Sequence, residues 1–353
     1  MRENCLKNGD FRQACGELLR KLKEVQRLGL VCHHNADPDS LLSAEVLKRI
    51  LGRKLSCEIL ILAPAGVSSL ARRMYEAIYG EEPLVEGIEE LMMCDVLGLV
   101  DVSTLEQLGH EAKDLIESKF RGKIFIVDHH EPHERTMRLS FLNLIEPTSK
   151  ATAIIVHRIA MWIGVELSKE EAEALMAAIL HDTRHLNILD IEVLEVMKHL
   201  LERGADYNKV NRLFRREVSI SERIARLKAA QRLKLYRVSK DGEDLLICIS
   251  QVSAFEASAA RALIELGADL ALVIGGKGED VRICARASPR FLEVTGTSLG
   301  KDVMMEIGKI VGGGGGGHDL AAGLNVRGSR EEVLKVLMKV LEDKLKTRLK
   351  EYV

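Results

Sequence analysis

Apolar and polar positions alternate along the first 130 residues in a way that predicts strands and helices in turn. An amphipathic helix is expected over about residues 1–28. Apolar runs typical of buried strands follow near 28–34, 56–62, 95–101 and 123–128, separated by helical spacing near 38–51, 68–79 and 104–119. Alternation of this kind builds β–α–β units. The fold class expected is α/β, with a mostly parallel sheet of about five strands flanked by helices.

The rest of the chain divides into a helical stretch and a second α/β pattern. Residues 149–237 are typical of helices almost throughout, and the last part, 206–237, is long and basic. Strand-like runs return after Gly242. We therefore expect an N-terminal domain over 1–205, a helical connector over 206–237 and a smaller C-terminal α/β domain over 238–353. The basic residues of the connector form either a solvated face or a track for a nucleic-acid strand.

Composition narrows the function classes. The chain has 353 residues, 46% of them hydrophobic and 29% charged, and a net charge of −2. That balance argues against a protein that coats long duplex DNA. No apolar stretch reaches the ~18 residues of a membrane span, and the N-terminus lacks the apolar region of a signal peptide. We expect a cytoplasmic protein with reduced cysteines and no membrane partner.

Ionisable side chains follow several of the apolar runs. They are His33, Asp37 and Asp39 after the first strand-like run, Asp101 after the third, Asp128, His129 and His130 after the fourth, and Asp182 at the end of a helical stretch. In a parallel α/β sheet, ligands bind beyond the carboxyl ends of the strands, so these groups should converge. Imidazole and carboxylate ligands without thiolate suit Mn²⁺, Mg²⁺, Fe²⁺ or Zn²⁺. The number of candidate ligands favours two ions.

Simpler explanations exist for single residues of this set. Asp37, Asp39 and Asp101 could each cap a following helix, a common role for aspartate. His34 competes with His33 as a ligand. A charge that ends a buried run needs a compensating partner, however, and three adjacent ionisable groups at one strand end are hard to explain by capping. Two ions bridged by a carboxylate can hold a hydroxide and stabilise attacking and leaving oxygens, which suits phosphate-ester hydrolysis.

A second candidate site lies in the C-terminal part. Six glycines over 312–317 precede His318, and glycine permits positive φ and close backbone approach. Gly315, Gly316 and Gly317 are therefore candidates for an anion-binding loop that uses backbone N–H groups. The alternative is a flexible tether, but the run is short and ends at once in His-Asp-Leu-Ala-Ala-Gly. Arg286 is a candidate phosphate partner because guanidinium binds phosphate with two hydrogen bonds; it could also be a surface arginine of a strand.

Together these residues resemble the DHH phosphoesterase superfamily, which includes RecJ-like exonucleases, nanoRNases and manganese pyrophosphatases. The triplet Asp128-His129-His130 is the motif that gives the family its name, and Gly315 to Gly323 resemble the GGGH pattern of the DHH-associated substrate-binding domain. The sequence departs from the family pattern at Ala36 and Leu42, where Pro and Gly are common. A Gly-Asp-Thr-Gly-like motif is replaced by His181-Asp182-Thr183-Arg184.

The resemblance implies a role for each matching residue. The first domain would be the metal-binding catalytic domain, with one Mn²⁺ bound by His33, Asp37 and Asp101 and the other by Asp39, Asp101, His129 and Asp182. Asp101 would bridge the ions. His130 would contact the scissile phosphate, and Asp128 would orient the histidines. Arg286 and His318 would grip substrate phosphates across a cleft between the domains. Arg184 and His185 could alter substrate choice.

These expectations favour a manganese-dependent phosphodiesterase that hydrolyses short oligonucleotides to mononucleotides by two-metal hydroxide attack, with adenosine bisphosphate as a further candidate substrate. Mg²⁺ or Co²⁺ could replace Mn²⁺. Aromatic residues make up only 4% of the chain, which disfavours a long stacking platform for single strands. A homodimer is compatible with the sequence.

Three alternatives remain open. The first is a RecJ-like single-strand exonuclease, for which the basic connector would guide the strand. The second is a phosphodiesterase of cyclic or linear dinucleotides. The third, not an enzyme, is a DHH-like scaffold of a replication complex. Scaffold relatives lose metal ligands, whereas this chain retains all of the candidate ligands.

Overall fold

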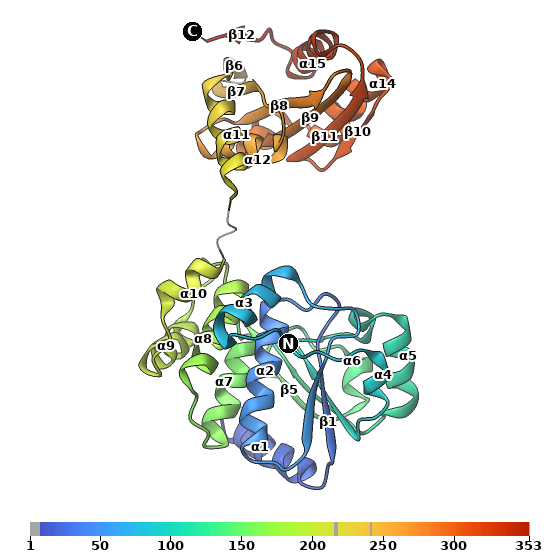
Figure 1. Ribbon diagram of the computed structural model, residues 1–353, viewed down its shortest axis with the longest axis vertical. Helices are drawn as coiled ribbons and strands as arrows, with labels where there is room; N and C mark the ends of the chain where they lie inside the picture. Colours follow the sequence, from blue (N-terminus) through green and yellow to red (C-terminus); the bar gives the residue numbers. More distant parts are fainter. Residues whose placement is uncertain (1–7, 215–217, 241, 353) are drawn as a thin grey trace. The chain divides into compact units, whose positions relative to one another are not determined.

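The computed structural model describes residues 8–214, 218–240 and 242–352. It divides into two compact units, Met1–Arg216 and Glu217–Val353 (Figure 1). Each unit contains its own β-sheet. None of the helices in the described ranges combines the length and apolar character that a bilayer span requires.

The first unit is built on five strands. They are β1 (Arg27–Val31), β2 (Glu58–Leu62), β3 (Val96–Val100), β4 (Ile124–Asp128) and β5 (Ser140–Ile145). All neighbouring strands run parallel, in the order β2-β1-β3-β4-β5. The expected parallel α/β sheet is confirmed. β5 was not among the expected strands, and its first four residues are only half-buried, which weakens the apolar signal.

Helices cover both faces of this sheet. They are α1 (Asn8–Leu22), α2 (Pro38–Gly52), α3 (Ser69–Tyr79), α4 (Ile88–Leu91), η1 (Leu105–Leu108), α5 (His110–Lys119), α6 (Glu134–Met137), α7 (Thr152–Trp162), α8 (Lys169–Asp182), α9 (Ile191–Glu202) and α10 (Tyr207–Leu213). Leu28 and Leu30 of β1 belong to the core formed with α1, α2, α7 and α8. Leu97 and Leu99 of β3 belong to the opposite core with α5. Burial on both faces explains why these strands are nearly continuous apolar runs.

The second unit has a mixed, mostly antiparallel sheet. Its elements are α11 (Ile220–Gln231), β6 (Lys234–Lys240), β7 (Glu243–Gln251), α12 (Glu256–Glu265), β8 (Leu270–Lys277), β9 (Asp280–Ala287), α13 (Pro289–Thr295), the π-helical segment η2 (Leu299–Met304), α14 (Met305–Val311), β10 (Gly314–Gly317), β11 (Ala321–Arg327), α15 (Arg330–Leu345) and β12 (Lys350–Glu351). The strand order is β10-β11-β9-β8-β7-β6-β12, and among the described strands of this sheet only β7 and β8 pair in parallel.

The range 206–237 differs from the single helical connector expected. It contains α10 in the first unit, α11 in the second, and the beginning of β6. Residues 215–217 within it, and residues 1–7 of the expected first helix, lie outside the described part of the chain. The sequence does not predict β6, because only two of its seven residues are buried and its alternation of apolar and polar positions is weak.

The glycine run also differs from the expected loop, because it forms the edge strand β10. A Cβ atom at Gly315 would overlap the carbonyl oxygen of Met304, and Gly317 has a φ of +144°. Gly315 packs directly on the backbone of η2, and a Cβ atom at Gly317 would overlap Ala321 and Ala322. Close packing therefore requires glycine at these two positions.

Candidate metal centre and phosphate-binding strand

The candidate ligands of the first unit converge at one edge of its sheet. His33 follows β1, Asp101 follows β3, and β4 ends at Asp128 with His129 next to it. These three strands are neighbours, and the strand order changes direction between β1 and β3. Ligands bind at such a switch point in open α/β sheets. Within the described residues, four groups of three side chains place their ligand atoms within 4.8 Å of one another: His33, Asp37 and Asp101; Asp39, His129 and Asp182; Asp101, His129 and His130; and Asp37, His181 and Asp182.

His33, and not His34, joins this cluster. The His33 Nδ1 lies 2.9 Å from the carbonyl oxygen of His34, to which it donates, so its Nε2 is left with a lone pair. That Nε2 lies 3.5 Å from Asp37 Oδ1 and 3.6 Å from Asp101 Oδ2. Burial lowers the pKa of His33, but Asp37 and the His34 carbonyl outweigh burial and raise the pKa to about 9. A metal cation would compete with that proton for the same lone pair.

Asp37 both caps a helix and faces the cluster. Its Oδ1 accepts a hydrogen bond of 3.1 Å from the backbone N–H of Ser40 in the first turn of α2. Pro38 occupies the first position of that helix, where its missing N–H is not needed. Capping and metal binding, considered as alternatives from the sequence, are therefore compatible in one residue.

Asp39 is fully buried and organises the start of α7. Its carboxylate accepts hydrogen bonds from the backbone N–H groups of Thr152 at 2.7 Å and Ala153 at 3.0 Å, and from the hydroxyl of Ser43 at 3.1 Å. The N-cap residue of α7, Ala151, has no side chain that could satisfy these groups. Burial and the charges of neighbouring aspartates raise the pKa of Asp39 well above its usual value. A cation beside this carboxylate would relieve that repulsion.

Asp101 lies at the centre of the cluster in an unusual backbone conformation. Its φ is +61°, a left-handed value that costs a non-glycine residue about 1–2 kcal/mol. Thr152 donates its hydroxyl hydrogen to Asp101 Oδ1 at 2.8 Å. The two Asp101 oxygens face different histidines, Oδ2 toward His33 at 3.6 Å and Oδ1 toward His129 at 3.5 Å. Burial and then the charge of Asp37 raise the pKa of Asp101 to about 6.

Thr152 is a site residue that sequence reasoning missed. It holds Asp101 through its side chain and Asp39 through its backbone N–H. Its only sequence signal is a hydroxyl residue at the start of a strongly apolar helix. Its role depends on the tertiary fold, which brings the first residue of α7 to the carboxylate of Asp101.

His129 provides the clearest indication of a metal ion. Its Nε2 is buried and has no hydrogen-bond partner within the described ranges. Yet this nitrogen lies 3.2 Å from Asp182 Oδ2, 3.5 Å from Asp101 Oδ1 and 3.9 Å from Asp39 Oδ2. A buried imidazole nitrogen surrounded by three carboxylates without a hydrogen bond fits coordination of a divalent cation.

His130 and Asp128 form a separate pair beside the ligands. The His130 Nδ1–H donates to Asp128 Oδ1 at 2.7 Å, and the same oxygen accepts the backbone N–H of His130 at 3.1 Å. Asp128 is buried, whereas the side chain of His130 is 45% exposed. The bond to Asp128, opposed by burial, raises the pKa of His130 to about 9. In the metal-free protein its imidazole is therefore oriented and protonated at neutral pH.

The second unit brings the other candidate residues together. The backbone N–H of His318 donates to the carbonyl of Ala321 at 2.8 Å and closes the hairpin between β10 and β11. Ala321 pairs with Arg286 of β9. Neither Arg286 nor His318 has a side-chain hydrogen bond or ion pair among the described residues. As an edge strand, β10 directs half of its backbone N–H groups away from β11.

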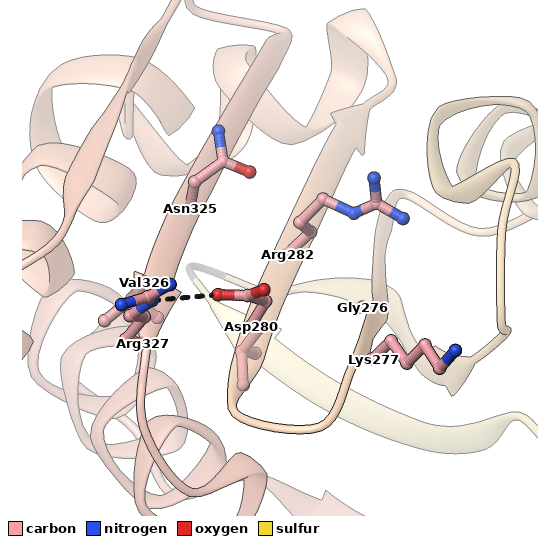
Figure 2. A pocket seen from close by; sticks show the side chains of 8 residues that line it. Gly276, Lys277, Asp280, Arg282, Asn325, Val326 and Arg327 are labelled. Atoms are coloured by element: carbon pink, nitrogen blue, oxygen red, sulfur yellow. Dashed lines mark hydrogen bonds and ion pairs between the residues drawn. The ribbon is translucent and has the colours of Figure 1, made fainter.

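A pocket of about 510 Å³ lies elsewhere on the same unit and is lined by residues of β8, β9 and β11 (Figure 2). Its two arginines already have acidic partners. Arg282 Nη2 lies 2.8 Å from Glu256 Oε1, and Arg327 Nε lies 3.2 Å from Asp280 Oδ1. Because the charges of these two arginines are locally compensated, they are weaker candidates for binding phosphate than Arg286.

Comparison with known proteins gives matches over most of the chain. Residues 27–179 match the model of the DHH family, N-terminal domain, and residues 256–347 match that of the DHHA1 domain. An uncharacterized protein of Methanocaldococcus jannaschii is 30% identical over 328 residues, covering 91% of this chain and 94% of its own. Both family assignments agree with the motifs in the sequence.

Solved structures are also similar to this chain. An exopolyphosphatase-related protein from Bacteroides fragilis shares the fold, with 18% sequence identity and a TM-score of 0.56, covering 95% of this chain and 97% of its own. RecJ from Thermus thermophilus, in complex with Mn²⁺, has 14% identity and a TM-score of 0.37, covering 98% of this chain and 57% of its own.

Proposed function

The chain belongs to the DHH family of phosphoesterases, and from this premise we propose that it hydrolyses short oligonucleotides to mononucleotides with two divalent ions, most readily Mn²⁺. Adenosine bisphosphate is a further candidate substrate. The observation that carries the proposal is the buried His129 Nε2, which lacks a hydrogen bond among the described residues and faces the carboxylates of Asp182, Asp101 and Asp39.

The residues fit two ions that share one ligand. His33, Asp37 and Asp101 would hold one ion, and Asp39, Asp101, His129 and Asp182 the other. Asp101 suits the bridging position because its two oxygens face the two histidines. Ions bound there supply positive charge to phosphoryl oxygens and lower the pKa of water. Thr152 keeps the bridging carboxylate in place through its hydroxyl.

His130 would act on the phosphate. Its Nδ1–H is held by Asp128, so the Nε2 on the opposite side of the ring is free to donate to a phosphoryl oxygen or a leaving oxygen. A histidine with a pKa of about 9 carries the proton that such a donor needs. Half exposure of the side chain leaves it accessible to substrate.

The second unit would bind substrate phosphate through Arg286, His318 and the backbone of β10. The two side chains lie on either side of Ala321 and have no partner among the described residues. An unpaired guanidinium can form two charge-assisted hydrogen bonds with one phosphate. The low aromatic content supports a substrate of a few nucleotides rather than a long strand.

The test is cleavage of labelled RNA and DNA of graded length. Purified protein with Mn²⁺ would be incubated with 5′-labelled strands of two to about twenty nucleotides, and Asp101→Ala would serve as the inactive control. Preferential cleavage of the shortest strands, lost in the variant, is the expected result.

Other outcomes point to different activities. Processive degradation of the longer single strands would favour a RecJ-like exonuclease. Cleavage of only cyclic or linear dinucleotides would assign the enzyme to that substrate class. Intact Mn²⁺ binding without turnover of any phosphodiester would contradict the proposal and favour a scaffold role.

A further inference from the structure

Three histidines and three aspartates form a closed ring at the metal centre. In order around the ring they are His33, Asp37, His181, Asp182, His129 and Asp101, which returns to His33. Imidazoles and carboxylates alternate, and each carboxylate therefore lies between two imidazoles. Two of the three histidines, His33 and His129, belong to the two-ion arrangement proposed above. His181 is the third, and no role has been assigned to it.

The oxygen atoms that face His181 are not used by the two-ion arrangement. Asp37 directs Oδ1 toward His33 at 3.5 Å and its other oxygen, Oδ2, toward His181 Nδ1 at 3.8 Å. Asp182 directs Oδ2 toward His129 at 3.2 Å and Oδ1 toward His181 Nδ1 at 2.9 Å. Each of these aspartates thus has a second oxygen next to the same imidazole nitrogen.

We propose that His181, Asp37 and Asp182 bind a third divalent cation beside the two-ion centre. The three side chains have the same ligand chemistry as the group of His33, Asp37 and Asp101, and their ligand atoms likewise lie within 4.8 Å of one another. Neighbouring ligands of an octahedral ion with bonds of about 2.1 Å lie about 3 Å apart, close to the spacing from His181 to Asp182. The proposal rests on the two-ion centre but not on the identity of the substrate.

The exposure of its ligands predicts that this third ion binds most weakly. The side chains of Asp37, His181 and Asp182 are 33%, 29% and 18% exposed, whereas Asp39, a ligand of the second proposed ion, is fully buried. An ion held by three accessible ligands keeps more water molecules and exchanges more readily. Those remaining positions give it room to contact a substrate oxygen. Asp37 and Asp182 would then each bridge two ions, as proposed above for Asp101.

A hydrogen bond is the simpler role for His181. Its Nδ1–H could donate to Asp182 Oδ1 at 2.9 Å and hold that carboxylate toward His129. In that case His181 would be a positioning residue, and the number of bound ions would not depend on it. The two roles therefore differ in metal stoichiometry, which can be measured without substrate.

The experiment is a Mn²⁺ titration of the full-length metal-free protein, with free Mn²⁺ counted by electron paramagnetic resonance. Wild type, His181→Gln and His181→Ala would be compared, with His185→Gln as the matched control. His185 lies four residues further on, where it contacts Asn211 and Phe214 outside the ring. Circular dichroism would verify that each variant is folded.

The expected result is three ions in wild type and in His185→Gln, with the third weaker by on the order of tenfold or more. Both His181 variants should saturate at two ions. Electron spin echo spectroscopy of bound Mn²⁺ should detect three imidazole nitrogens in wild type and two in the variants. Saturation of wild type at two ions, or equal stoichiometry in wild type and the His181 variants, would overturn the third site and leave the two-ion centre intact. A folded wild type that binds no Mn²⁺ would overturn the proposed function together with this inference.

Discussion

The two candidate sites of this chain differ in how completely the protein itself satisfies their polar groups. In the metal centre, Asp39 accepts three hydrogen bonds and Asp101 accepts one from Thr152. In the second unit, Arg286 and His318 have no side-chain partner among the described residues. The protein itself therefore fixes the carboxylates of the first site, whereas the two side chains of the second site remain available to a ligand.

This difference follows from the number and sign of the charges gathered at each site. Four aspartates crowd the metal centre, and neighbouring carboxylates keep their geometry only when backbone and hydroxyl donors fix them. A half-buried arginine on a strand needs less support of this kind, because water can solvate its guanidinium until a ligand such as phosphate replaces the water. The metal centre should accordingly tolerate substitution poorly, and the phosphate site should lose affinity in a graded way.

The largest expected effect is that of Asp39→Asn. Loss of this proposed metal ligand should lower kcat/KM by on the order of 10³-fold or more, because metal charge stabilisation amounts to several kcal/mol. Burial and neighbouring charges raise the pKa of Asp39, so its charged form is disfavoured without metal. In metal-free Asp39→Asn the amide nitrogen would face the backbone N–H of Thr152 or of Ala153, and this contact between two donors offsets the relief of the buried charge. The stabilisation by Mn²⁺ should disappear.

The matched control for this substitution is Asp95→Asn. Asp95 accepts the backbone N–H groups of Gln26 and Arg27 at 3.0 and 2.9 Å, at the opposite edge of the same sheet. Its loss should leave kcat/KM unchanged. Equal Mn²⁺ stabilisation of wild type and Asp39→Asn in thermal melts would show that Asp39 is not a ligand.

A fall in pH should lower the stability of the first unit through a buried histidine outside the metal centre. His157 of α7 is 7% exposed, and its Nε2 lies 2.8 Å from Nδ1 of His199 in α9. Burial, then the neighbouring His199 and Arg158, lower the pKa of His157 to about 4. The stability that depends on neutral His157 is complete above the unfolded pKa of about 6.5 and is lost as the pH falls toward 4, by up to about 3 kcal/mol.

This contribution can be isolated by comparing wild type with His157→Gln. Asp101, with a pKa of about 6, titrates in the same pH range in both proteins. The contribution of His157 is therefore the difference in free energy of unfolding between wild type and His157→Gln. Urea unfolding at pH 7 and pH 5 would be followed by the fluorescence of Trp162, the single tryptophan, which reports on α7. The free energy of unfolding of wild type relative to His157→Gln should be lower by about 2 kcal/mol at pH 5 than at pH 7. A difference independent of pH would contradict a depressed pKa.

A smaller effect is expected at the phosphate site. Arg286→Ala should raise KM by about 10- to 100-fold with little change in kcat, since a charge-assisted hydrogen bond contributes about 1.5–3 kcal/mol. Arg282→Ala is the matched control, because Arg282 lies on the same strand and is paired with Glu256 at 2.8 Å. Equal effects of the two substitutions would mean that general charge, rather than the position of Arg286, determines affinity.

The sequence allowed prediction of those features that depend on local pattern and sheet topology. Apolar runs that end in Asp or His predicted both the parallel sheet and the edge at which His33, Asp101 and His129 meet. Thr152 could not be recognised, because its contact with Asp101 joins residues 51 apart in the chain. The sequence did not predict a role for His181, because its neighbour Asp182 already matched the family motif. Only the fold shows that His181 Nδ1 lies 3.8 Å from Asp37 Oδ2.

The glycine run shows a second limit. Glycine has low strand propensity, so the run was expected to be a loop. Its strand is imposed by pairing with β11 and by packing on η2, where a side chain at Gly315 would overlap Met304. Tertiary packing of this kind overrides propensity and has no local signal.

The smallest expected effect concerns the segment after Asp182. Arg184, His185 and Leu186 have φ values of +50°, +58° and +64°, three consecutive left-handed residues without a glycine. Such a conformation is strained and persists where the surroundings require it. Arg184→Gly should therefore stabilise the first unit by about 0.5–1 kcal/mol, measured by urea unfolding.

Arg184→Ala separates the backbone from the side chain. It removes the guanidinium but keeps the Cβ atom, so the strain remains and stability should not rise. If the strained turn exists to present Arg184 to a substrate phosphate, both variants should lose affinity by a similar factor, while only Arg184→Gly gains stability. Unchanged affinity in both would mean that the strain serves the position of Asp182 instead. In that case the strain would belong to the metal centre, the site whose carboxylates the protein itself fixes.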